Sequence, residues 1–205
     1  MGNNVVAGGT IKGMQAVART TPNIEIPEFQ TILADLKLSA ADSKSDWITR
    51  DVFDTAIKKV EKFEPSDVDI FVKLFTLFDV QGNNTVDYKD FIAGASTCLT
   101  TAQNSEKLQF AMAIYDSSNT KCILKGDLKK LLYTINNVTS FFGDPVIRPN
   151  QIDTIVFDVY KAFPSSAGKG IGFDVCIEAL LANEIVKVFL NGGGRLRFGD
   201  PELKL

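Results

Sequence analysis

The chain is 205 residues long, with 45% apolar and 23% charged residues and a formal net charge of −3 at neutral pH. This length can form one or two compact domains with a substantial core. The small net charge and the lack of a long basic run argue against binding to nucleic acid or to an anionic membrane surface. No apolar run approaches the roughly 18 residues of a membrane-spanning helix, and no secretory signal is visible, so we expect a cytoplasmic protein without a membrane span.

The sequence contains no histidine. This removes the commonest general base and both the Ser–His and Cys–His nucleophile pairs, and it excludes a mixed Cys/His zinc site. Cys98, Cys122 and Cys176 are far apart in the chain and are interpreted as reduced side chains. The glycine run Gly192–Gly194 precedes no predicted helix and is not a phosphate-binding loop. We therefore expect no enzymatic activity.

The N-terminal half begins with residues 1–27, which are rich in Gly, Asn and Thr and are predicted to form an extended arm. Residues 28–60 show helically spaced apolar residues on both sides of a polar loop, which predicts a helix–loop–helix unit. A second unit begins at Glu64, where a proline and acidic residues favour the first turn of a helix. Its entering helix leads to a loop at Asp79, and its exiting helix follows from Phe91.

The C-terminal half repeats this organisation. A third unit is predicted to begin near Asn104, and a fourth at Asn150, which we expect to cap the entering helix. The last exiting helix is predicted from about Phe173 to Leu190. The tail, residues 191–205, is rich in glycine and charge and is predicted to be extended.

One short pattern recurs in all four units. It consists of a β-branched residue, then four residues, the last of which is the final position of the loop, and then an apolar residue. The β-branched residues are spaced 38, 37 and 48 apart, at Ile48, Val86, Ile123 and Ile171. The pattern is typical of an EF-hand, whose twelve-residue calcium loop carries its bidentate carboxylate at position 12. We therefore predict an all-α fold of two lobes of paired EF-hands, residues 28–100 and 101–190, with extended N- and C-terminal arms.

The loop of the second unit, loop II (residues 79–90), keeps the most metal ligands. Its candidate ligands are Asp79, Gln81, Asn83, the carbonyl of Thr85, Asp87 and Asp90. Asn84 replaces the usual turn glycine, and the aspartate at position 12 is one methylene shorter than glutamate, which favours Mg²⁺ over Ca²⁺. The sequence thus predicts weak Ca²⁺ or Mg²⁺ binding here at most, and the alternative is a hydrogen-bonded loop without metal.

The other three loops are poorer candidates. Loop III, residues 116–127, keeps its first and last aspartates but places Lys121 at the turn, where a second cation is electrostatically unfavourable. Loop I (residues 41–52) and loop IV (residues 164–175) both have valine at position 12, which supplies no oxygen. We expect no metal in loops I and IV.

From about residue 28 to 190 the chain resembles four-EF-hand proteins of the neuronal calcium sensor, calcineurin B and calaxin type. The resemblance rests on Phe75…Phe78-Asp79, Val86-Asp87-Tyr88…Phe91-Ile92, Leu108…Ala111…Tyr115-Asp116 and Ile171–Asp174 followed by Ala179-Leu180. It implies an apolar groove that holds a partner's helix, here with Phe75, Met112 and Leu132. Calcium switching is not implied, because most ligands are missing. Gly2 follows Met1, but Val6 stands where a myristoylation motif has Ser or Thr.

The leading hypothesis is a non-catalytic structural or adaptor subunit that binds an amphipathic helix of a larger assembly constitutively. The calaxin-like resemblance implies the ciliary axoneme as its location, with tubulin or axonemal proteins as partners. Arg195, Arg197 and Phe198 are the expected C-terminal anchors, because two cations and an aromatic ring suit an acidic surface with an apolar pocket. The alternative is a calcium-responsive regulatory subunit, similar to calcineurin B, that uses loop II.

Overall fold

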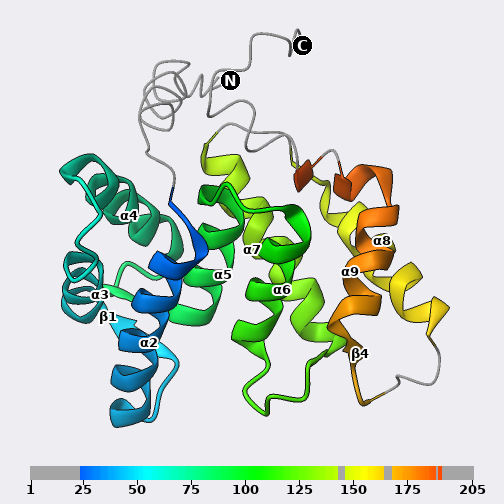
Figure 1. Ribbon diagram of the computed structural model, residues 1–205, viewed down its shortest axis with the longest axis horizontal. Coiled ribbons are helices and arrows are strands. Elements are labelled where there is room, and N and C mark those ends of the chain that lie inside the picture. The colour runs from blue at the N-terminus through cyan, green and yellow to red at the C-terminus, as the bar shows by residue number, and fades with distance from the viewer. Residues whose placement is uncertain (1–23, 143–145, 164–167, 188, 191–205) are drawn as a thin grey trace, which may run out of the picture.

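The computed structural model describes residues 24–142, 146–163, 168–187 and 189–190. Helices make up most of this part of the chain, and the expected all-α fold of paired helix–loop–helix units is confirmed (Figure 1). None of the described helices combines the length and apolarity needed to cross a membrane. The expected arm anchors Arg195, Arg197 and Phe198 lie outside the described residues, as does most of the N-terminal arm.

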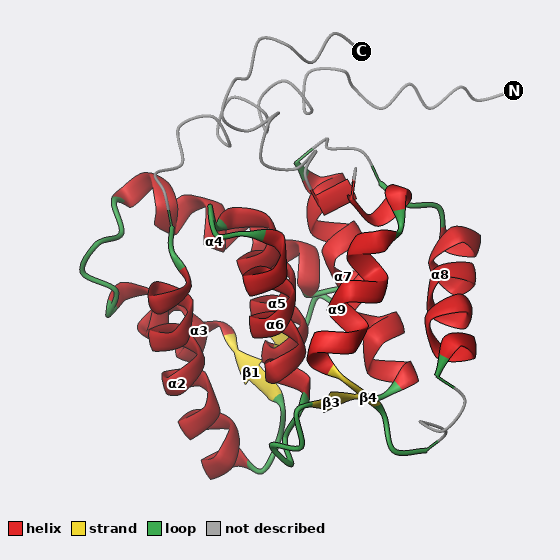
Figure 2. Cartoon of the chain, turned by 45° about the vertical axis from the view of Figure 1, so that its right-hand side comes forward, coloured by secondary structure: helices red, strands yellow, loops and turns green. Residues whose placement is uncertain are grey.

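The elements follow one another as two similar halves. The first half contains α2 (Ile26–Ser43), β1 (Trp47–Thr49), α3 (Arg50–Lys58), α4 (Pro65–Phe78), β2 (Thr85–Asp87) and α5 (Tyr88–Leu99). The second half contains α6 (Asn104–Tyr115), β3 (Cys122–Ile123), α7 (Lys125–Phe141), α8 (Pro149–Ala162), β4 (Ile171–Gly172) and α9 (Phe173–Ala182). Figure 2 shows the short strands between the helices of each half.

The position-8 residues of the four loops meet in two antiparallel strand pairs. Ile48 of β1 lies opposite Val86 of β2, and Ile123 of β3 lies opposite Ile171 of β4. All four side chains are buried. Loop I is therefore joined to loop II, and loop III to loop IV, as two lobes of paired units require.

Helix α2 begins earlier than the sequence suggested, at Ile26 rather than at residue 28. Glu25 is the N-cap, and its backbone N–H donates to Glu28 Oε2 at 3.0 Å. This bond satisfies a backbone donor that has no hydrogen-bond partner within the helix. Ile24, which is buried, forms a parallel bridge with Thr100. Ile24 is therefore packed on the helical body, and Ile26 and Pro27, which were expected in the extended arm, belong to α2.

The start of helix α8 also differs from the expectation. Arg148, not Asn150, is the N-cap, and Pro149 occupies the first helical position. Proline is suited to that position because its φ angle is fixed near the helical value and it has no N–H to leave unsatisfied. The backbone N–H of Arg148 donates to Gln151 Oε1 at 3.1 Å, which completes the cap.

The last predicted helix is interrupted. Helix α9 ends at Ala182, and helical backbone resumes at Glu184 instead of running unbroken from Phe173 to Leu190. Asn183 Oδ1 accepts the backbone N–H groups of Ile185 at 3.0 Å and Val186 at 3.3 Å. Asparagine at this point caps a new helical segment, and this local bond competes with continuing the old one.

Helix α5 is the centre of the molecule, with α2 and α4 on one side and α6 and α7 on the other (Figures 1 and 2). Every residue of α5 from Phe91 to Leu99 is buried. In the N-terminal half, the Phe53 ring lies 5.0 Å from the Phe75 ring and 4.7 Å from the Phe91 ring, measured between centroids. The buried residues of both halves form one continuous core.

Helices α5 and α7 pack against each other between the two halves. A Cβ atom placed on Gly94 would lie 2.9 Å from a methyl carbon of Thr134 and 2.9 Å from one of Val138. The ring of Phe78 would be 3.3 Å away. Only glycine fits this contact without displacing a neighbour. The backbone of α5 at Gly94 therefore packs directly against the side chains of α7. We refer to this contact of Gly94, Thr134 and Val138 as the α5–α7 seam.

Candidate functional site

Loop II has the backbone of an EF-hand loop, and its first aspartate shapes it. Asp79 ends α4, and its Oδ1 and Oδ2 accept the backbone N–H groups of Asn83 at 3.0 Å and Asn84 at 2.9 Å. Gly82 and Asn84 have φ values of 65° and 59°. Asparagine adopts this left-handed conformation more readily than most residues, so Asn84 replaces the usual turn glycine as expected.

The middle of loop II is satisfied by its own polar groups. The side-chain oxygen of Asn83 accepts the backbone N–H of Thr85 at 3.1 Å and its hydroxyl at 2.7 Å. The amide of Asn83 donates to Gln81 Oε1 at 3.3 Å. The candidate ligands at positions 3 and 5 thus bond to each other and to position 7.

The last two candidate ligands of loop II point to the other half of the molecule. Asp87 caps α5, and its Oδ2 lies 3.0 Å from Lys130 Nζ on α7. Asp90 Oδ1 lies 2.9 Å from the same ammonium and accepts the hydroxyl of Tyr115 at 2.8 Å. The carboxylates of positions 9 and 12 therefore contact α6 and α7 rather than converging with Asp79.

Burial and charge shift the ionisation of this group. Burial, together with the neighbouring Asp87, raises the pKa of Asp90 against the opposing effects of Lys130 and Tyr115. Burial and the charge of Asp90 raise the pKa of Tyr115, so its hydroxyl keeps its proton and donates. Burial lowers the pKa of Lys130, but Asp90 and Asp87 outweigh it and the net shift is upward. Lys130 therefore carries its charge at neutral pH.

The residues of loop II do not fit a calcium ion in this arrangement. Calcium takes six to eight oxygens, and a bidentate carboxylate at position 12 usually supplies two of them. Here Asp90 would first have to leave both Lys130 and Tyr115. Across the described ranges, no three or more Asp, Glu, Cys or His side chains are grouped so that they could hold a metal ion.

Loop III has the same backbone form with fewer ligands. Asn119 and Lys121 have φ values of 52° and 55°, at the loop positions that Gly82 and Asn84 occupy in loop II. Asp116 accepts the backbone N–H groups of Thr120 at 3.0 Å and Lys121 at 2.6 Å. Burial raises the pKa of Asp116, but these backbone donors lower it by more, so the net shift is downward.

Loop IV departs from the EF-hand form, and the sequence pattern did not reveal this. Among its described residues, Gly168 and Gly170 are left-handed, at positions 5 and 7, whereas Lys169 at position 6 is not. A Cβ on Gly170 would lie 2.7 Å from the carbonyl oxygen of Ile123, so the glycine allows the close approach of loops III and IV. Residues 164–167, including candidate positions 1 and 3, lie outside the described residues.

The residues expected to line a helix-binding groove are in the core. Phe75 is 1% exposed, and Met112 and Leu132 are fully buried. In this conformation they offer no surface to a partner, because α5 and its neighbours close over them. Helix binding through these three residues stays a prediction, and it requires the lobes to open.

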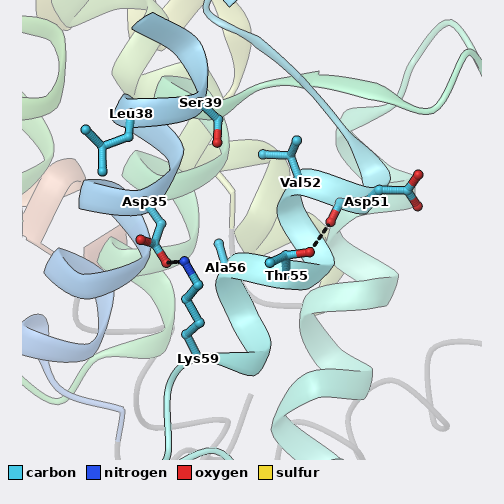
Figure 3. A pocket seen from close by; sticks show the side chains of 8 residues that line it. All are labelled: Asp35, Leu38, Ser39, Asp51, Val52, Thr55, Ala56 and Lys59. Carbon is cyan, nitrogen blue, oxygen red and sulfur yellow. Dashed lines mark hydrogen bonds and ion pairs between the residues drawn. The ribbon is translucent and has the colours of Figure 1, made fainter. Parts of the chain in front are cut away.

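An exposed cleft between α2 and α3 provides a different surface (Figure 3). It has a volume of about 320 Å³ and is lined by Asp35, Leu38, Ser39, Asp51, Val52, Thr55, Ala56 and Lys59. Leu38 is 67% exposed, and Lys59 Nζ pairs with Asp35 Oδ2 at 3.0 Å. The available sequence signal was the position of Leu38, which falls off the buried stripe of α2.

Comparisons with known proteins find partial similarities to several curated proteins, although no protein-family model matches the chain. Calcium-binding protein K of Dictyostelium discoideum is 29% identical over 105 residues, which are 51% of this chain and 53% of that protein. The type 2 form of calcineurin B from Rattus norvegicus is 37% identical over 60 residues, 29% of this chain and 34% of the relative. Lysophosphatidylcholine acyltransferase 2 of Danio rerio is 27% identical over 94 residues, 44% of this chain and 18% of that protein.

The chain thus spans about half or less of the length of these relatives. The first two similarities, together with the paired loops, support placement in the EF-hand superfamily. The match to the acyltransferase covers a small part of that protein and carries no conclusion about catalysis.

Proposed function

We propose that this chain is a non-catalytic EF-hand subunit that binds a protein partner constitutively within a larger assembly. The observation that carries the proposal is the close packing of the two lobes at the α5–α7 seam. At Gly94 the helices leave no room for a methyl group, and the apolar residues on both sides are already buried. A calcium switch would have to separate these packed helices before it exposed a groove, whereas a surface outside the core needs no such opening.

The α2–α3 cleft is the surface we assign to the partner. Leu38 and Val52 give it an apolar wall, and Asp51 has no lysine or arginine within ion-pair distance among the described residues. An amphipathic helix with an apolar anchor next to a basic residue matches this chemistry. Burying the exposed two-thirds of Leu38 is worth about 1–2 kcal/mol, which corresponds to about a tenfold change in affinity.

The ciliary axoneme is our proposal for the location, with tubulin or axonemal proteins as partners. It rests on the resemblance of the sequence to calaxin-type proteins. The proposed lack of catalysis rests on the absence of histidine from the whole chain.

A calcium-responsive regulatory subunit is the second candidate. The observation in its favour is the backbone of loops II and III, where left-handed residues recur at the same two positions. The calcium-binding and calcineurin B relatives support the same function. The two candidates differ in one measurable property, which is the dependence of partner binding on calcium.

Affinity purification of the tagged chain, followed by mass spectrometry, identifies the partner and its binding segment. The affinity of the purified chain for that segment is then measured in calcium and in chelator. The proposal expects equal affinities, and a tenfold gain in calcium would overturn it in favour of the regulator. Leu38→Asp should weaken binding about tenfold. The matched control is Ile185→Asp, at an apolar residue that is 43% exposed but lies outside the cleft and the four loops.

A further inference from the structure

Lys130 occupies a position where a cation contacts both C-terminal carboxylates of loop II. Its ammonium is 2.9 Å from Asp90 Oδ1 and 3.0 Å from Asp87 Oδ2. The side chains of Asp87 and Asp90 are 16% and 20% exposed, whereas that of Lys130 is 45% exposed. Two carboxylates that are this close together and this far out of water need a counter-charge.

The surroundings hold this ammonium in place. Lys130 comes from α7 in the second half, whereas both carboxylates come from the first half, so its ion pairs join the two lobes. The hydroxyl of Tyr115 fixes Asp90, and the ammonium lies 5.7 Å from the centre of the Tyr115 ring. The neighbouring Lys129 is different, because it pairs with Asp153 on α8 in its own half through two half-exposed side chains.

We propose that Lys130 is a built-in cation that takes the place of a divalent ion at the end of loop II, fastens the two lobes together and keeps the loop closed to metal. A metal ion and the ammonium compete for Asp87 and Asp90. The poor fit of loop II to calcium is then caused by Lys130 and Tyr115, in addition to the ligands that the loop has lost. This inference goes beyond partner binding, since it concerns the isolated chain.

The test compares Lys130→Met with the wild-type chain by calorimetric titration with Mg²⁺ and with Ca²⁺, and by thermal melting without metal. Methionine keeps a long apolar stem and removes the charge. We expect the affinity for the divalent ion to rise about tenfold or more, because a charged competitor has been removed. We also expect a lower melting temperature without metal. Lys130→Arg, which keeps the charge, and Lys129→Met, its neighbour on α7, should both behave like the wild-type chain.

Two further variants make the result specific. Adding Asp90→Asn to Lys130→Met should abolish the gain in affinity. Tyr115→Phe, which frees Asp90 from one hydrogen bond, should give a smaller gain, and it keeps the proposal testable if Lys130→Met does not fold. Unchanged ion affinity in a folded Lys130→Met chain, or a gain that survives Asp90→Asn, would overturn the inference. Submicromolar calcium binding by loop II of the wild-type chain would also overturn the inference, and it would count against the proposed function as well.

Discussion

Substitution of Gly94 by alanine tests whether the two lobes form one closely packed body. The added methyl carbon would lie 2.9 Å from methyl groups of both Thr134 and Val138. Carbon atoms prefer a separation of about 3.5–4.0 Å, so both contacts are repulsive. Both neighbours are β-branched residues within a helix, where the side chain has one or two allowed rotamers and cannot swing aside.

Two opposing effects set the size of the change. Alanine is favoured over glycine in a helix interior by up to about 1 kcal/mol. Overpacking a tight core costs about 1–3 kcal/mol. The expected net result at Gly94 is a loss of about 1 kcal/mol, which lowers the melting temperature of a chain of this size by about 2–4 °C.

Gly126→Ala is the matched control, because Gly126 lies in the first turn of α7 and a Cβ there would meet nothing within 4 Å. It should stabilise the chain by up to about 1 kcal/mol. Thermal melting of both variants, and of Gly94→Ala combined with Val138→Ala, completes the test. The cost of Gly94→Ala should shrink when Val138 is already truncated. If Gly94→Ala stabilised the chain as much as Gly126→Ala does, the seam would not be closely packed and the lobes could separate easily.

Three further predictions concern the core, the first helix cap and the metal loops. Truncating Phe53, which is fully buried, to alanine should cost about 3–5 kcal/mol in urea unfolding, and a loss below about 1 kcal/mol would contradict its core position. Burial raises the pKa of Glu28, but the ion pair with Lys62 and two backbone donors hold it below its ordinary value of 4.5. The stability advantage of the wild-type chain over Glu28→Gln should therefore be complete above about pH 4.5 and fade as the pH falls through the lowered pKa; an advantage independent of pH would refute this. Calcium binding by calorimetry should be no tighter than about 10⁻⁴ M, with any site lost in Asp79→Ala and mostly kept in Asp116→Ala.

The pairing of the loops could be predicted from sequence because it depends on a short local pattern. A β-branched residue at loop position 8 is suited to a strand, and its recurrence in four units predicted two pairs of loops taken in chain order. Ile48 with Val86, and Ile123 with Ile171, are the pairs that result. Hydrophobic spacing in the helices added the all-α fold class, since apolar stripes with a period of 3.6 residues must be buried against one another.

Helix ends were less predictable, because several residues compete to cap one helix. Asn150 is a favourable cap by type, yet Pro149 already fits the first helical position, which moves the cap back to Arg148. Asn183 lies inside an otherwise apolar helical pattern and starts a new segment there. In both cases the choice depends on side-chain hydrogen bonds that spacing alone does not determine.

In the candidate site, the sequence predicted the loop positions of the ligand residues but not the directions of their side chains. Loop numbering placed Asp87 and Asp90 at positions 9 and 12, but the direction of their side chains depends on Lys130, about forty residues further along the chain. Apolar spacing likewise identified Phe75 and Met112 as inward-facing residues. The same spacing is expected for residues that line a binding groove and for residues that form a closed core. Only the packed helices reveal that both residues are buried in this conformation.

An ion can switch a protein only by the difference between its affinities for two conformations. In the closed form seen here, an ion at loop II must displace Lys130 from two carboxylates and Tyr115 from one of them. It must also open the seam at Gly94 before any groove is exposed. At about 1 μM free calcium and a dissociation constant of about 10⁻⁴ M, binding contributes about 0.01 kcal/mol, far less than the roughly 5.5 kcal/mol needed to invert a population of 1:99. Partner binding by this chain should therefore depend on its exposed surfaces and not on the calcium concentration.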